Sequence, residues 1–552
     1  MAENNRTPDL AGGVAAAGLT ISVGGRRLLD SAELALAPGD KAALVGRNGS
    51  GKSTLLAVLA SMAAAGRPPE HVELGGSLTF ASGTVVASLP QSPQLAFTGS
   101  ARAYLDVCAG EASAAWNRHE ELVGALTAGG QDPALLREYG DALDAMDRLS
   151  AWDLPQRMAE VTGGLGLPAD VIDRSLSALS GGQATRLALA GVLLSPANLL
   201  LLDEPSNNLD LASLRFLATW IRASPATLLL VSHDRGLIDG AIGEVLEIEE
   251  HTGRLRRYGG GYSFYAERKR EEREAQARRF AEQEERRRQL EASVRGIAAR
   301  ASRFQATSQD DFYRSKGARV AKLAKGQRSR IERELSRIAE PEPPAQPRLT
   351  VLAAEHRDGL LVRAVGLGLR YGDAEVLRDM GLQVRHGDRV AVAGANGTGK
   401  STLLKLLVGE LTPSTGVVER RPGLRLGYLP QVPEAVGAAM SLLDFALRRY
   451  RGPAEELRPI LGKVLFDDPA RVRASDVSLG ELRRIECAAL FAGAPDLAVL
   501  DEPTNHLDLL SIEMLETALD EYRGALVVVS HDARFLERVR PSATIDLDQR
   551  AG

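Results

Sequence analysis

The amino-acid sequence predicts an α/β protein made of two copies of one domain, joined by a charged α-helical segment. A glycine-rich loop ending in Gly-Lys-Ser occurs twice, at residues 46–53 and 394–401. Later motifs repeat at a constant spacing of 298 residues, for example Ser180 with Ser478. Between the copies, residues 262–340 carry 21 Lys and Arg against 13 Asp and Glu, and they resemble neither copy.

Composition narrows the class of protein. A chain of 552 residues can hold several domains. No apolar run reaches the 18 residues that a membrane-spanning helix needs, and Met1–Gly18 lacks the pattern of a signal peptide. Cys108 and Cys487 lie far apart without metal-ligand spacing, which fits a reduced compartment and no disulfide. We therefore expect a soluble cytoplasmic protein.

Both glycine loops lie between a predicted strand and a predicted helix, which is the context of a phosphate-binding P-loop. Backbone N–H groups at the helix N-terminus would bind phosphates, and Lys52 and Lys400 would meet the β- and γ-phosphates. Ser53 and Ser401 would ligate magnesium, so ATP and Mg²⁺ are the predicted cofactors. The residues expected around the phosphates are Gly46, Asn48, Gly49, Ser50, Gly51, Lys52, Ser53 and Thr54, and in the second copy Gly394, Asn396, Gly397, Thr398, Gly399, Lys400, Ser401 and Thr402.

An apolar run that ends in Asp-Glu follows in each copy, at Asp203-Glu204 and Asp501-Glu502. A buried strand of this kind beside a P-loop suits ATP hydrolysis. The aspartate would hold magnesium, and the glutamate would deprotonate the attacking water as a general base. One strand later, His233 and His531 could contact the γ-phosphate.

The two copies differ in length between these motifs. Lys52 and Lys400 are 348 residues apart, Gln91 and Gln431 are 340 apart, and the later motifs are 298 apart. The first copy therefore carries 42 additional residues between Gln91 and its signature serine. Within this insert, 134–149 has the pattern of an amphipathic helix after Asp132-Pro133. The insert could be an arm that contacts a partner or a larger helical subdomain.

Two sequence motifs indicate a protein family. Leu179 to Gln183 (Leu-Ser-Gly-Gly-Gln) resembles the signature of ABC-type ATPases. Asp501 to Asp508 (Asp-Glu-Pro-Thr-Asn-His-Leu-Asp), together with twin copies and a charged linker, resembles the ABC-F family, and the resemblance covers about residues 14–548. It implies two ABC-type P-loop ATPase domains joined by an α-helical hairpin, coiled-coil-like linker. The implied domains are 14–261, with the arm insert at about 92–178, the linker 262–346, and 360–552.

The resemblance also implies roles for particular residues. The two domains would close head to tail within one monomer, so that each P-loop faces the other domain's signature. Gln91 and Gln431 would contact magnesium and the attacking water, and Asp210 and Asp508 would lie at the interface. Tyr371 would stack on adenine. The implied signature contacts are Ser180, Gly181, Gly182, Gln183, Ser478, Gly480 and Glu481.

Two departures from the family pattern fall on one composite site, that of the first P-loop and the second signature. Leu479 stands where the first copy has Gly181, and Val23 stands where the second has Tyr371. Glycine lets a backbone approach phosphate closely, whereas leucine adds a bulky side chain. We therefore expect the second domain's site to turn over and the first to hold ATP longer. Asn208, opposite His506, is a third change without an assigned effect.

The linker is the predicted binder of a polyanion. Its net charge is +8 in a chain of −5, so the remainder carries −13. Its return half, 314–330, has seven basic residues and no acid. Basic residues spaced by three wind around a helix, as suits a helix threaded between RNA backbones. The candidates are Arg314, Lys316, Arg319, Lys322, Lys325 and Arg328. The alternative is a solvated spacer.

Together these features predict an ATP-dependent ribosome-binding protein. The resemblance implies that the linker enters near the ribosomal RNA and the P-site tRNA at the peptidyl-transferase region, giving resistance to a macrolide-type antibiotic. One alternative is a housekeeping ABC-F translation factor. The other, from a different class, is the ATP-binding subunit of an ABC transporter.

Overall fold

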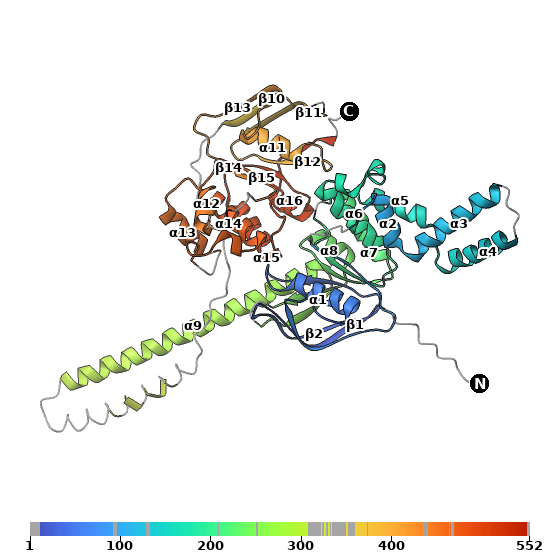
Figure 1. Ribbon diagram of the computed structural model, residues 1–552. Coiled ribbons are helices and arrows are strands. Elements are labelled where there is room, and N and C mark those ends of the chain that lie inside the picture. The colour runs from blue at the N-terminus through green and yellow to red at the C-terminus, as the bar shows by residue number, and fades with distance from the viewer. Residues whose placement is uncertain are drawn as a thin grey trace. The chain divides into compact units, whose positions relative to one another are not determined.

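The computed structural model describes most of the chain in two compact units. One unit comprises Met1–Ser263 and Pro347–Gly552 and holds both copies of the repeated domain; the other, Phe264–Gln346, holds the linker (Figure 1). The described residues are 12–91, 97–128, 133–207, 209–249, 252–306, 322, 325–326, 329–331, 333, 349–351, 359–372, 374–433, 437, 440–462, 464 and 468–548.

The first domain is built on a six-stranded sheet in the order β5-β6-β7-β3-β8-β9. All neighbours are parallel except β8 and β9. The central strands are unbroken apolar runs, such as Leu199–Leu202, because both faces are covered. The strands are β3 (Lys41–Val45), β5 (Val86–Leu89), β6 (Leu199–Asp203), β7 (Thr227–Val231), β8 (Glu244–Ile248) and β9 (Leu255–Gly259).

A three-stranded antiparallel sheet, in the order β2-β1-β4, packs against this sheet. Its strands are β1 (Val14–Val23), β2 (Arg26–Leu36) and β4 (Val72–Phe80). They bury alternate side chains, as a sheet with one wet face does. The apolar side of helix α1 (Lys52–Ala65) joins both sheets in one core through Leu55 and Leu59. The P-loop helix is therefore rigidly held.

The remaining helices of the first domain include the predicted insert. They are α2 (Ala101–Ala109), α3 (Glu111–Thr127), α4 (Pro133–Arg148), α5 (Leu154–Gly164), α6 (Gly181–Leu194), α7 (Leu211–Ala223) and α8 (Arg235–Ala241). Helix α4 confirms the helix expected at 134–149; the expected cap, Asp132, lies outside the described residues. Figure 1 shows α3 and α4 side by side, projecting from the sheets. They share a small core around Met146 and are linked by the Arg118–Glu138 ion pair.

The second domain repeats this plan with a shorter P-loop helix, of 9 residues against 14 in the first domain. Its sheets have the orders β14-β15-β16-β12-β17 and β11-β10-β13. The strands are β10 (Leu360–Tyr371), β11 (Ala374–Arg385), β12 (Arg389–Ala393), β13 (Thr415–Arg420), β14 (Leu426–Leu429), β15 (Leu497–Asp501), β16 (Ala525–Val529) and β17 (Ala543–Asp546). The helices are α11 (Lys400–Val408), α12 (Leu442–Leu447), α13 (Ala454–Gly462), α14 (Leu479–Ala492), α15 (Leu509–Glu521) and α16 (Ala533–Val539).

The two domains are joined by ion pairs near α8 and α16. Arg235 on α8 contacts Glu516 at 2.6 Å and Asp532 at 3.0 Å, and all three side chains are largely buried. In the opposite direction, Arg534 on α16 pairs with Asp239. Each domain therefore contributes one arginine to the contact.

The linker unit contains α9 (Tyr262–Ala306), a 45-residue helix that begins directly after Gly260-Gly261. Its exposed charges neutralise one another along the helix, for example Arg288 with Glu284 at 3.1 Å and Arg287 with Glu291 at 3.1 Å. A turn is expected at about 301–313, but residues 301–306 continue α9; residues 307–313 lie outside the described residues, and so does most of the return half. The described residues of that half, 322, 325–326, 329–331 and 333, are helical. In the described part of the chain, no helix is both long and apolar enough to cross a membrane.

Candidate nucleotide-binding sites

Each P-loop connects the end of a central strand to a helix. Gly51 and Gly399 cap these helices with φ of 100° and 93°, in the left-handed region that glycine alone adopts readily. The Lys52 Nζ donates to the carbonyls of Gly46 and Arg47, at 2.8 and 3.0 Å. Lys400 does the same to Gly394 at 2.6 Å and Ala395 at 2.9 Å. Both ammonium groups are buried, and burial lowers the pKa of each.

The Asp-Glu pairs lie where β6 and β15 end. Glu204 and Glu502 have φ of 50° and 45°, and each backbone N–H donates to the neighbouring strand. These turns direct both carboxylates of a pair toward the P-loop. Burial is the main cause of a raised pKa for Asp203 and Asp501, which hydrogen-bond with the P-loop serines Ser53 and Ser401 respectively.

Each predicted general base is paired with the predicted histidine. His233 Nε2 lies 3.3 Å from Glu204 Oε1, and His531 Nε2 lies 3.2 Å from Glu502 Oε1. The backbone N–H of His531 also donates to Glu502 Oε2 at 3.2 Å. Burial raises the pKa of Glu502 to about 7 and that of Glu204 to about 8. It lowers the pKa of His531 to about 4 and that of His233 to about 3, so both imidazoles are neutral at pH 7.

Ser180 and Ser478 begin the signature helices, and both form capping boxes. Ser180 Oγ accepts from the backbone N–H of Gln183, and Gln183 Oε1 accepts from the backbone N–H of Ser180 at 3.0 Å. Glu481 makes the equivalent bond to Ser478 at 2.9 Å. These bonds aim the helix N-terminus, with its unpaired N–H groups and positive end, into the site. The structure thus gives Gln183 and Glu481 a local role that the sequence did not suggest.

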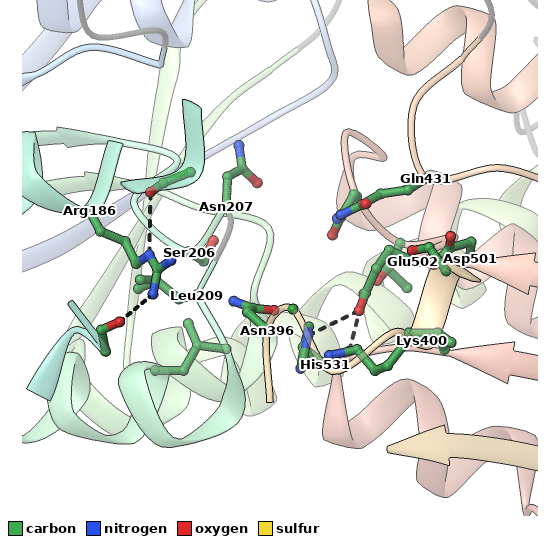
Figure 2. A pocket seen from close by; sticks show the side chains of 18 of the residues that line it. Arg186, Ser206, Asn207, Leu209, Asn396, Lys400, Gln431, Asp501, Glu502 and His531 are labelled. Carbon is green, nitrogen blue, oxygen red and sulfur yellow. Dashed lines mark hydrogen bonds and ion pairs between the residues drawn. The ribbon is translucent and has the colours of Figure 1, made fainter. Parts of the chain in front are cut away.

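The first signature faces the second P-loop across a cavity of about 670 Å³. Figure 2 shows Arg186, Ser206, Asn207 and Leu209 of the first domain on one side, opposite residues of the second. The predicted residues that line this cavity are Ser180, Gly182, Gln183, Tyr371, Asn396, Gly397, Gly399, Lys400, Ser401, Thr402, Gln431, Asp501, Glu502 and His531. Glu204 and His233 also reach it. We call it the larger site.

The second signature faces the first P-loop across a cavity of about 260 Å³, which we call the smaller site. The predicted residues lining it are Asn48, Gly49, Gly51, Lys52, Ser53, Thr54, Gln91, Asp203, Glu204, His233, Ser478 and Gly480. The structure does not bring every candidate to a cavity wall. The candidates that line neither cavity are Gly181 and Glu481 of the signatures and Gly46, Ser50, Gly394 and Thr398 of the P-loops.

The domains touch directly at the smaller site. A Cβ at Gly480 would lie 1.7 Å from Asn48 Nδ2 and 2.5 Å from the His506 carbonyl, so only glycine fits. Leu479, in contrast, points into the cavity with 51% of its surface exposed. The bulky residue therefore narrows the smaller site without separating the domains.

The aromatic difference between the sites is visible in the structure. Tyr371 ends β10, is 53% exposed and lines the larger site. Val23 ends β1 at the matching position but packs on the domain core and lines neither cavity. Sequence reasoning missed Leu28 and Val376, which line the smaller and larger sites respectively. Their separation of 348 residues, the same as that of the P-loop lysines, was the available signal.

The predicted RNA-binding residues are described only in part. Lys322 and Lys325 are helical and exposed. Arg314, Lys316, Arg319 and Arg328 lie outside the described residues.

Two P-loop domains in one chain, each signature facing the other domain's P-loop, define an ATP-binding cassette ATPase.

Family models described as "ABC transporter" match residues 29–207 and 377–505, and another with this description matches 248–350. The Escherichia coli K12 protein "Probable ATP-binding protein YheS" is 34% identical over 96% of this chain and 77% of its own. "Tylosin resistance ATP-binding protein TlrC" of Streptomyces fradiae is 35% identical over 94% and 95%. Human "ATP-binding cassette sub-family F member 3" is 30% identical over 94% and 69%.

The chain belongs to the ABC-F family, and it is an ATPase. Solved structures share the twin-cassette fold. The structure titled "RNase-L Inhibitor" matches 94% of this chain and 86% of its own, with a TM-score of 0.53 and 19% identity. The archaeal ribosome recycling factor aABCE1, solved with the stalk protein aP1, matches 91% and 82%, with a TM-score of 0.51 and 19% identity.

Proposed function

We propose that the protein binds the ribosome in an ATP-dependent way and protects it from a macrolide-type antibiotic. The observation that carries this proposal is the likeness to the tylosin resistance protein, which spans 94% of this chain and 95% of that one, linker included. The linker's basic return half would lie against ribosomal RNA near the P-site tRNA. The exposure of Lys322 and Lys325 agrees with this role.

ATP hydrolysis at the larger site would depend on Glu502 as the general base. A carboxyl with a pKa of about 7 is partly ionised in the cell, so it can take a proton from water. The His531 ring stays neutral at this pH, and the backbone N–H of His531 donates to Glu502 Oε2 at 3.2 Å, which holds the carboxylate in place. Lys400, now bonded to loop carbonyls, would exchange them for phosphate oxygens. In the smaller site Glu204, His233 and Lys52 have the same arrangement.

The donors around each P-loop serine fit a magnesium ion. Asp203 Oδ1 and Asp501 Oδ1 are buried and make no hydrogen bond within the described structure, so each of these oxygens can coordinate a metal ion. Serine hydroxyl, carboxylate and amide oxygens are the hard ligands that Mg²⁺ takes. Ser53, Asp203 and Gln91 would hold it in the smaller site, and Ser401, Asp501 and Gln431 in the larger. In each site the ion would neutralise negative charge on the phosphates of ATP.

Sedimentation with ribosomes tests the proposal. The double variant Glu204→Gln, Glu502→Gln keeps the shape of the sites but removes both general bases, so ATP should hold the protein closed on the ribosome. We expect it to pellet with ribosomes in ATP and to stay in the supernatant without nucleotide. Its ATPase rate should fall at least ~10²-fold, the usual scale for a lost general base. A supernatant protein in both conditions would refute ribosome binding; co-sedimentation with membranes instead would favour a transporter subunit.

The likeness to YheS and to human sub-family F member 3 supports a second candidate, a housekeeping translation factor. A drug experiment separates the two. In a macrolide-sensitive host, expression of the parent protein should raise the inhibitory concentration of tylosin, and the double variant should not. If the parent leaves drug sensitivity unchanged yet pellets with ribosomes, the housekeeping function holds.

A further inference from the structure

A buried arginine in the second domain connects its catalytic strand ends. Arg483 lies on α14 with only 1% of its surface exposed. Its Nη2 donates to the carbonyl of Asp501 at 2.9 Å and of Glu502 at 3.2 Å, and its Nη1 donates to the carbonyl of Pro430. The planar guanidinium thus bridges the ends of β14 and β15, which pair in parallel in the sheet.

Those two strand ends carry the groups expected to act on ATP at the larger site. Pro430 immediately precedes Gln431, while Asp501 and Glu502 are the predicted magnesium ligand and general base. Any shift of the Arg483 side chain would therefore move the backbone on both sides of the attacking water.

The same helix begins at the other nucleotide site. One turn before Arg483, Leu479 and Gly480 form a wall of the smaller site, and Gly480 lies against Asn48 of the first P-loop. The backbone of α14 is rigid over this distance, because its cap is closed and its residues from Leu482 to Ala492 are buried. Arg483 consequently links a surface engaged at one site to the strand ends of the other.

The first domain does without this arrangement. At the 298-residue spacing, Thr185 matches Arg483 and Ala188 matches Glu486. Thr185 Oγ1 only donates back along its own helix, to Gly181 at 3.0 Å. In the second domain, Glu486 lies 3.5 Å from Arg483 and 3.4 Å from Arg449, with 1% exposed. Since the same fold forms without these charges, and burying them is costly, the fold alone does not explain them.

We propose that Arg483 is a positioning residue that couples the two ATP sites: it ties the strand ends bearing Gln431 and Glu502 to the signature helix held by the first P-loop. Engagement of the second signature at the smaller site then sets the geometry for hydrolysis at the larger. Only the second domain's signature helix carries this connection, because the first domain's has threonine at this position.

The first test measures kcat and KM of three full-length variants. Arg483→Met with Glu486→Gln removes both buried charges together, Arg483→Lys keeps the charge but cannot bridge the carbonyls, and Thr185→Val is the matched control. We expect kcat to fall about 10- to 100-fold in the first two, as for a small misplacement of catalytic groups, with KM within about twofold. The control should keep the parent kcat. A parental kcat in either arginine variant would overturn the proposal, and Arg483→Lys decides alone if the double variant does not fold.

The second test addresses the coupling itself. Asn48→Ala removes the contact to the second signature and should lower kcat in the parent protein. In the Arg483→Lys background the same substitution should lower kcat by a clearly smaller factor, because the connection is already broken. Equal factors in both backgrounds would show that Arg483 only supports its own site and that the sites are independent.

Discussion

Asn48 and His506 join the two domains across 458 residues of sequence. The Asn48 Nδ2 donates to the His506 carbonyl at 2.9 Å, and its backbone N–H donates to Asp508 Oδ2 at 3.1 Å. Asp508 also caps α15 by accepting from Ser511, and it is buried. Asp210, its counterpart, caps α7 in the same way and is half-buried. The smaller site is therefore held by direct bonds from the first P-loop to the other domain.

This asymmetry leads to a prediction about turnover. Glu502→Gln should remove most ATP hydrolysis, at least ~10²-fold, whereas Glu204→Gln should leave a substantial remainder. The physical reason is that the larger site has Tyr371 and an open signature, while the smaller site is narrowed by Leu479. Steady-state phosphate release from the two single variants measures it. Equal losses, or the reverse order, would mean that Leu479 and Val23 are tolerated.

The raised pKa of Glu502 predicts a pH dependence. A general base must be ionised, so the rate should fall as pH drops through the pKa of about 7 and level off above about 8. His531, whose pKa is lowered to about 4, should not titrate in this range. The profile is best recorded in the Glu204→Gln variant, where the larger site dominates. A flat rate between about pH 6 and 8 would exclude Glu502 as the base.

Charge reversal tests the linker. Lys322→Glu with Lys325→Glu should weaken ribosome pelleting and make it less sensitive to salt, because fewer counterions are released. Basal ATP hydrolysis should stay unchanged, since neither lysine lines a nucleotide cavity. The matched control is Arg287→Glu with Arg288→Glu on α9, where each arginine already has a glutamate partner. If both pairs behave alike, or binding is unaffected, the linker is only a spacer.

The arm formed by α3 and α4 can be shortened without opening the main core. Replacing 124–137 by a short Gly-Ser loop removes the tip and leaves the core around Ala115 and Met146 in place. We expect weaker ribosome pelleting with the ribosome-free ATPase rate and melting temperature unchanged. A collapsed melting transition would instead identify the insert as part of the domain's folding unit.

Much of the site was predictable because its signals are local. A P-loop needs consecutive glycines before a helix, and the Asp-Glu pairs follow unbroken apolar strands, so residues such as Lys52 and Glu502 stand out in sequence. The constant 298-residue spacing then transferred each assignment from one domain to the other. The expected helix in the insert was found for the same reason, since its periodicity is contained in one stretch.

What the sequence could not predict depends on packing between distant segments. Arg483 carries no motif, and its importance emerges only when β14 and β15 bring the carbonyls of Pro430 and Glu502 together. Likewise, the sequence predicted a nucleotide contact for Gln183, and the structure adds that this residue closes a capping box at the edge of the larger site. The sequence around Leu28 has only the apolar pattern of a strand, and the structure shows that Leu28, on β2, lines the smaller site.

The two arginines between α8 and α16 favour the pairing of a first domain with a second. At the 298-residue spacing, Arg235 corresponds to Ala533, Arg534 to Gly236, and Glu516 to Ala218. Asp532 corresponds to Asp234, so two first domains placed face to face would leave Arg235 with one acidic partner instead of two and would set the partly exposed Asp239 opposite a glycine. Two second domains would bury Glu516 and Asp532 with no arginine between them.

The pairing of two second domains therefore leaves buried carboxylates without an arginine, and an unpaired buried charge costs about 3–5 kcal/mol. Pairing of two second domains from different chains is thereby disfavoured, although the sheets and P-loops of the two domains are nearly the same. All of these ion pairs form together only between a first and a second domain.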